Sequence, residues 1–173
     1  MLFFSGFSLA REEYLFDEYL KKSDYTVSGF SYGAIKAFDN VRQQLASLKR
    51  VDTLQLISPA FFQTKDSKFK RMQILAYSKN ERAYMNQFMN SCFEPYEKKI
   101  VEHRNTSKEE LDELLNYEWD LEELQKLVDK GVKIEVYLGE MDKIIDVEAA
   151  REFFLQVATV TYIKEANHFL QTN

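Results

Sequence analysis

A serine between two glycines is the residue of this sequence best placed for chemistry. Residues 29–33 are Gly-Phe-Ser-Tyr-Gly, which puts Ser31 at the centre of a G-x-S-x-G motif. The motif follows an apolar run typical of a strand and precedes an amphipathic helix. Such a turn raises the serine hydroxyl above a sheet, and it is so tight that the flanking residues must be small. We therefore predict a nucleophile at Ser31. The alternative is an ordinary turn in which the serine caps a helix.

A nucleophilic serine needs a base, and the sequence contains two histidines. His168 follows residues 160–163, which have the pattern of a last strand, so we expect it at the carboxyl end of a sheet. Open α/β sheets build their sites at that edge, where Ser31 is also expected. His103 lies between charged residues instead, which is typical of a solvated helical surface. The sequence favours His168 as the base, and a purely structural imidazole is the alternative.

The base in turn needs an acid that holds its tautomer and stabilises its protonated form. Asp142 lies in the loop after the predicted strand 134–138, again at the carboxyl edge. Asp146 is the runner-up, but it directly precedes a predicted helix, where aspartate commonly serves as the N-cap. Glu140 is a further candidate in the same loop. We predict that Asp142 is the acid.

The charged oxygen that forms when a serine attacks a carbonyl group needs two hydrogen-bond donors. The backbone N–H of Tyr32 points into the site from the first turn of the helix after Ser31. A second donor should come from the loop after an earlier strand. We assign it to the backbone N–H of Phe7, with Gly6 allowing a close backbone approach. A simple turn that ends the strand is the alternative for Gly6 and Phe7.

Strand-like and helix-like segments alternate, which predicts an α/β fold with a mostly parallel sheet of about five strands. The predicted strands are residues 2–4, 24–28, 53–58, 132–138 and 159–163, and the predicted helices are 11–21, 32–48 and 147–158. The chain is expected to form a single domain over 1–173. Residues 61–130, between the third and fourth strands, look helical throughout and predict a cap over the site.

The predicted strands alternate between apolar and polar residues. If the strands lie in sequence order, right-handed crossovers put every connecting helix on one face of the sheet. The other face should then be bare of helices and should meet water or a partner subunit. Thr26, Gln55, Glu135 and Thr161 should point to that bare face. The residues expected to point into the core are Tyr25, Val27, Leu54, Leu56, Ile134, Val136, Val160 and Tyr162.

The bulk composition excludes several classes of protein. The net charge of −5 argues against nucleic-acid binding. Cys92 is the only cysteine, so neither an internal disulfide nor a cysteine metal site is expected, and we interpret Cys92 as a buried structural residue. No run approaches the roughly 20 apolar residues of a membrane span, and residues 1–4 do not resemble a signal peptide. We expect a cytoplasmic protein without a membrane partner.

One stretch has the opposite charge from the whole. Residues 65–82 contain six basic and two acidic side chains. If they form one helix, four of the basic residues fall near one face, which would attract an acidic partner. A solvated charged surface is the alternative. The candidate binding residues are Lys68, Lys70, Arg71, Lys79 and Arg82.

The order Ser31, Asp142, His168 and the loops around these residues resemble the α/β-hydrolase superfamily over nearly the whole chain. The initial strands of the usual sheet are absent, and Ser5 stands where many relatives have a histidine. The short chain, its Phe-Phe-Ser-Gly-Phe start and its helical cap look closest to the pimeloyl-acyl carrier protein methyl ester esterases of biotin synthesis. The compact BioV type is the nearest, and the BioG type is next.

This resemblance implies a serine carboxylesterase that works through an acyl-enzyme, without a metal or other cofactor. Its substrate would be the methyl ester of a pimeloyl chain on acyl carrier protein, and the basic cap residues would contact that carrier. Two alternatives stay open. One is another acyl esterase or thioesterase of the same fold, and the other is a non-catalytic module that binds the carrier.

Overall fold

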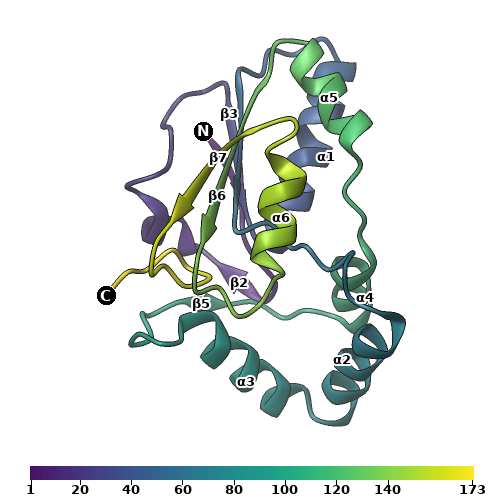
Figure 1. The fold of residues 1–173 in the computed structure, drawn as a ribbon, viewed down its shortest axis with the longest axis vertical. Coiled ribbons are helices and arrows are strands. Elements are labelled where there is room, and N and C mark those ends of the chain that lie inside the picture. Colours follow the sequence, from purple (N-terminus) through teal and green to yellow (C-terminus); the bar gives the residue numbers. More distant parts are fainter.

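Five parallel strands form the central sheet of the computed structural model, which describes residues 1–173. Their order across the sheet is β1-β3-β4-β6-β7, which is also their order in the sequence (Figure 1). The bounds are Leu2–Phe4 for β1, Thr26–Phe30 for β3, Thr53–Ile57 for β4, Lys133–Gly139 for β6 and Thr159–Ile163 for β7. The predicted α/β class and the in-order parallel sheet are confirmed.

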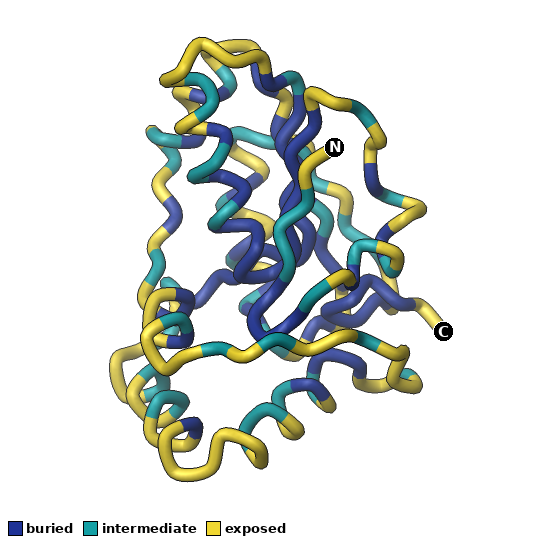
Figure 2. Tube along the Cα trace, turned by 180° about the vertical axis from the view of Figure 1, so that it is seen from behind, coloured by how far each residue is buried: buried dark blue, intermediate teal, exposed yellow.

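The connecting helices lie on one face of this sheet, as right-handed crossovers between in-order strands require. They are α1 (Tyr32–Ala46), α5 (Leu121–Asp129) and α6 (Val147–Phe154) (Figure 1). Helices α2 (Ser67–Lys79), α3 (Glu81–Phe93) and α4 (Lys108–Asn116) lie across the carboxyl ends of the strands. The outer surface of α2 and α3 is largely exposed, whereas the central strands are buried (Figure 2).

The segment 61–130 is not helical throughout, contrary to our prediction. Residues Glu102–His103 form a short strand, β5, that pairs antiparallel with β2 (Leu9–Ala10). His103 therefore lies in a strand and not on a helix. In addition, α5 packs its apolar face into the main core beside β6, with Leu124 fully buried. We therefore use "the cap" for α2, α3, β5 and α4 only, and treat α5 as the crossover helix before β6.

The polar face of the sheet is only partly bare. Thr26 and Gln55 are each 1% exposed, because residues 11–25 cover them with a short 3-10 helix, η1 (Glu12–Phe16), and an irregular segment. No α-helix lies on this face (Figure 1). Gln55 explains the arrangement, since its side chain accepts from Lys21 N (3.0 Å) and donates to Tyr19 O (3.0 Å). An irregular backbone needs such polar partners when it is buried.

The prediction of a bare face is therefore wrong beside β3 and β4. It is right at the edge strand β7, where Thr161 is exposed, while Glu135 is intermediate. The predicted helix 11–21 shrinks to η1. Tyr25, predicted in the core, is 42% exposed because it precedes β3. No helix combines the length with the apolar composition that a membrane crossing would require.

Candidate active site

Ser31 lies in a sharp turn between β3 and α1, with φ 53° and ψ −115°. A positive φ is rare for residues other than glycine, and strain of this kind is typical of a nucleophile turn. The turn needs its two glycines. A Cβ atom on Gly29 would lie 2.2 Å from Gly33 O, and one on Gly33 would lie 2.0 Å from Phe4 O. The backbone of Ser31 is also bonded to the end of β4, through Ile57 O at 2.9 Å.

The structure brings Ser31, His168 and Asp142 into one chain of hydrogen bonds. His168 Nε2 lies 3.0 Å from Ser31 Oγ, and His168 Nδ1 lies 2.6 Å from Asp142 Oδ2. All three residues are buried, and the imidazole is 1% exposed. The other carboxylate oxygen of Asp142 accepts from the backbone of Ile144 (2.7 Å) and Ile145 (3.3 Å), which fixes its orientation. Chemically, this arrangement can take the proton of the serine hydroxyl.

The two competing carboxylates have other partners. Asp146 caps α6, accepting from Ala149 N at 3.2 Å, and its second oxygen accepts from the hydroxyl of Thr64. Glu140 accepts from the backbone N–H of Glu165 at 2.9 Å. Of the three candidates, Asp142 alone is bonded to the histidine.

The two residues predicted to supply the oxyanion donors have side chains in contact. Tyr32 is the first residue of α1, so its N–H has no partner within the helix. The N–H of Phe7 makes no hydrogen bond within the protein, whereas that of Gly6 donates to Glu12 Oε1 at 2.7 Å. The rings of Phe7 and Tyr32 meet edge to face at 6.4 Å. The amide of Phe7 is therefore free to serve the site, whereas the amide of Gly6 is occupied.

Asn167, which precedes the candidate base, organises the histidine loop. Its Oδ1 accepts from the backbone of Phe169 (2.9 Å) and Gln171 (3.0 Å). Its Nδ2 donates to Phe93 O at the end of α3, at 2.7 Å. Our sequence reasoning missed this role, although asparagine commonly bonds to backbone groups nearby in the chain. The asparagine holds the loop in which His168 stands.

An apolar cavity of about 220 Å³ lies between the cap helices and the loops that contain Phe7 and Ile144. It adjoins the site through Phe7, the candidate oxyanion residue, and Ile144, two residues after Asp142. The other lining residues are Phe62, Phe69, Gln73, Tyr84, Gln87, Phe88, Ser91, Leu111, Leu114, Leu115 and Lys143. Most of these are apolar, so the cavity suits an aliphatic group. No cluster of three or more histidine, cysteine or acidic side chains is arranged to hold a metal ion.

The basic stretch is two helices and not one, contrary to our assumption. Asn80 ends α2 and caps α3, accepting from Ala83 N at 3.0 Å. Arg82 therefore belongs to α3, while Lys68, Lys70, Arg71 and Lys79 belong to α2. None of these five cations forms an ion pair within the protein. Their charges are free to act on a partner.

Cys92 is 2% exposed, and burial raises the pKa of its thiol well above the usual value. Because the thiolate is the reactive form, the native protein should resist alkylation by iodoacetamide at pH 8. The same treatment in 6 M guanidinium, about the concentration that unfolds most small proteins, should label one thiol per chain. Mass spectrometry measures both. Complete labelling of the native protein within minutes would contradict the buried structural role.

The fold and the Ser-His-Asp geometry together define the class. A parallel sheet, a strained serine turn between strand and helix, and an acid and then a histidine after later strands are the features of the α/β-hydrolase fold. The chain has this fold. No family model matches the sequence, and no curated protein does.

Solved structures match over most of the chain. BioG from Haemophilus influenzae matches with a TM-score of 0.58 and 12% identity, covering 98% of this chain and 88% of BioG. A bromoperoxidase from Bacillus anthracis matches with a TM-score of 0.62 and 12% identity, covering 83% of this chain and 60% of the bromoperoxidase. Naproxen esterase from Bacillus subtilis matches with a TM-score of 0.53 and 18% identity, covering 96% of this chain and 62% of the esterase. The chain thus spans most of BioG, but less than two thirds of the other two enzymes.

Proposed function

We propose that the chain is a serine carboxylesterase. Ser31 is the nucleophile, His168 the general base, Asp142 the orienting acid, and the backbone N–H groups of Phe7 and Tyr32 bind the oxyanion. The observation that carries the proposal is the unbroken hydrogen-bond chain from Asp142 through His168 to Ser31 at a strained turn.

In this mechanism His168 Nε2 takes the proton of Ser31 Oγ as the oxygen attacks the ester carbonyl carbon. The negative charge on the former carbonyl oxygen is stabilised by the two amides. When the intermediate collapses, the C–O bond to the alcohol breaks, and the imidazolium gives its proton to the leaving alcohol. Water, activated by the same imidazole, then hydrolyses the acyl-enzyme and releases the acid.

The proposed substrate is the methyl ester of a pimeloyl chain carried by acyl carrier protein. Three observations support it. The sequence resembles this group of esterases, the fold matches BioG over nearly the full length of both chains, and the apolar cavity beside Phe7 and Ile144 suits a flexible aliphatic chain. No cofactor is needed for this reaction.

The exposed face of α2 supports a carrier protein as the partner. Lys68, Arg71, Met72, Leu75 and Lys79 recur at spacings of three and four and so share one side of the helix. Met72 is 54% and Leu75 55% exposed. Free cations around exposed apolar groups fit an acidic partner that buries a small apolar patch, and acyl carrier proteins are strongly acidic.

The test reverses charges on this surface. The double variant Lys68→Glu/Arg71→Glu should lower kcat/KM on a carrier-linked pimeloyl methyl ester by about tenfold or more at low salt, because exposed charges govern encounter. It should also flatten the salt dependence of kcat/KM. Adding Lys79→Glu and Arg82→Glu should enlarge both effects. Hydrolysis of a small soluble methyl ester should change by less than about twofold.

The matched control is Lys49→Glu/Lys130→Glu, which makes the same charge change at exposed residues without ion pairs, outside the cap. Its rates on both substrates should stay near the unmodified values. Equal losses on both substrates in the α2 variants would contradict the carrier surface. A thioester of the same acyl chain that is cleaved faster than the methyl ester would favour a thioesterase instead.

A further inference from the structure

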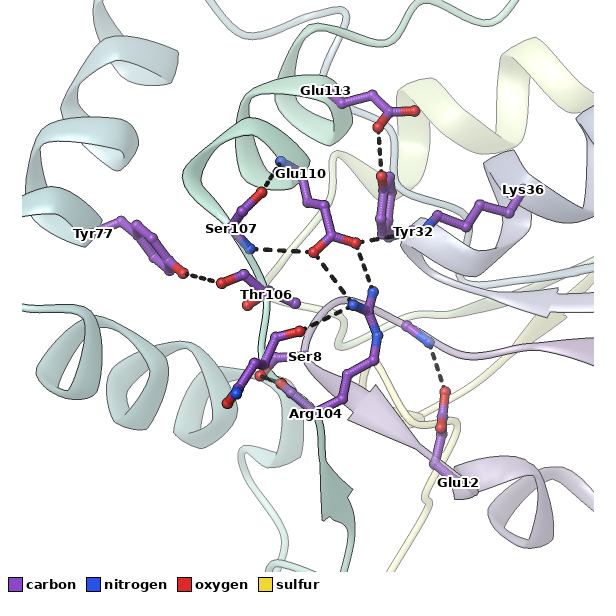
Figure 3. Close-up of polar contacts among 12 residues, drawn as sticks. Ser8, Glu12, Tyr32, Lys36, Tyr77, Arg104, Thr106, Ser107, Glu110 and Glu113 are labelled. Carbon is purple, nitrogen blue, oxygen red and sulfur yellow. Dashed lines mark hydrogen bonds and ion pairs between the residues drawn. The ribbon is translucent and has the colours of Figure 1, made fainter.

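Glu12 is a buried carboxylate outside the proposed triad. It is 0% exposed, and its Oε1 accepts from Gly6 N at 2.7 Å (Figure 3). Its Oε2 has no hydrogen-bond partner. Burying a carboxylate with one oxygen unsatisfied is costly, so the contact with Gly6 needs an explanation beyond packing.

The contact lies one residue before the proposed oxyanion donor. Gly6 is confined on its other side, since a Cβ atom there would lie 2.9 Å from Phe30 Cδ1. On the far side of Phe7, Ser8 is held by the cap, because its O accepts from Arg104 N and its Oγ donates to Arg104 O, both at 3.1 Å (Figure 3). The Phe7 amide is therefore fixed between two anchors.

The cap anchor is itself braced. Arg104 is paired with Glu110 of α4 at 2.9 Å, and Glu113 of the same helix accepts from the phenol of Tyr32 at 2.6 Å (Figure 3). Helix α4 thus contacts one proposed donor residue, Tyr32, and holds the anchor next to the other, Phe7. The Gly6 side has no such brace from the cap, and there Glu12 is the side chain that bonds to the loop.

We infer that Glu12 is a positioning residue, which holds the N–H of Gly6 so that the N–H of Phe7 stays directed at the oxyanion. The inference rests on the proposed function. Desolvation raises the pKa of the Glu12 carboxyl group, against the lowering effect of the Gly6 amide.

Three substitutions separate this role from simple packing. Glu12→Gln keeps a carbonyl oxygen that can accept from Gly6, whereas Glu12→Asp is one methylene too short and Glu12→Ala has no acceptor. We expect Glu12→Asp and Glu12→Ala to lower kcat by about 10- to 100-fold, with KM within about twofold. Removal of an oxyanion donor lowers kcat by about 100- to 1000-fold, and a displaced donor should cost less. Gln should keep kcat within about threefold. Glu13→Ala, on the same short helix, is the matched control and should behave as the unmodified chain.

A second measurement does not depend on turnover. Phenylboronic acid forms a tetrahedral adduct with an active serine that resembles the transition state, and isothermal titration calorimetry measures its binding. Its affinity should fall in parallel with kcat across the Gln, Asp and Ala variants, as transition-state binding requires. Melting temperatures identify any variant that does not fold, in which case the remaining two decide.

Unchanged kcat and boronate affinity in folded Asp or Ala variants would overturn the inference. Equal losses of kcat in Glu12→Gln and Glu12→Ala would also overturn it, because the proposed contact requires only a hydrogen-bond acceptor, which glutamine retains. Unmodified protein that hydrolyses no ester would instead contradict the proposed function, and the boronate series would still report on the Glu12 contact.

Discussion

Ser31→Ala is expected to lower kcat on any ester substrate by about 10⁴-fold or more, because no other hydroxyl is bonded to His168. The fold should survive, since the substitution removes only the Oγ atom and the backbone of the turn is held by its glycines and by β4. Ester hydrolysis measures the loss of activity, and circular dichroism and thermal melting show whether the fold survives. A variant with more than about a tenth of the normal rate would rule out the nucleophile.

Labelling with a fluorophosphonate gives the same prediction without a substrate. The unmodified chain should gain one adduct, mapped to Ser31 by peptide mass spectrometry, and Ser31→Ala should gain none. Ser58 provides the matched control, since it is another fully buried serine after a strand, and its hydroxyl has no partner. Ser58→Ala should still be labelled at Ser31.

Asp142→Asn should cost about 10³- to 10⁴-fold in kcat, as removal of the orienting charge does in enzymes of this type. The side-chain NH2 group of the asparagine can also donate to His168 Nδ1. That bond would stabilise the tautomer with its proton on Nε2, which cannot take the serine proton. Asp146→Asn should stay within about twofold, because asparagine caps helices as well as aspartate does. The kcat values of the two variants measure the ranking. If Asp146→Asn were the more damaging change, the assignment of the acid would be wrong.

Local patterns predicted the elements that position the candidate site. The glycines around Ser31 fix the turn whatever surrounds it, because their Cβ atoms would overlap backbone. The loops of Asp142 and His168 follow strands that are clear in the sequence, and parallel strands bring their carboxyl ends to one edge. The start of α4 is likewise determined locally, because Ser107 and Glu110 form a capping box there.

Long-range partners decided the features that the sequence did not predict. Residues 11–21 have apolar spacings that allow a helix, but only Glu12–Phe16 form a helical turn. Tyr19 O and Lys21 N are bonded instead to the side chain of Gln55, which lies on another element. The strand at Glu102–His103 exists because residues 9–10, far away in the chain, pair with it. Glu12 and Asn167 are single polar residues whose roles depend entirely on what they meet in the folded chain. Composition and spacing carry no signal for such contacts.

The side chain of Asn167 anchors one part of the cap, the last turn of α3, while α2 has no such anchor. It ties the last turn of α3 to the backbone of the residues around His168, so separating that turn from the sheet means breaking the histidine loop as well. These two segments therefore belong to one cooperative unit of local unfolding. Helix α2 packs mainly on α3 and α4 and has no comparable bond to the sheet. We therefore expect that any opening of the cap that leaves the His168 loop intact begins at α2, the helix with the exposed basic and apolar surface.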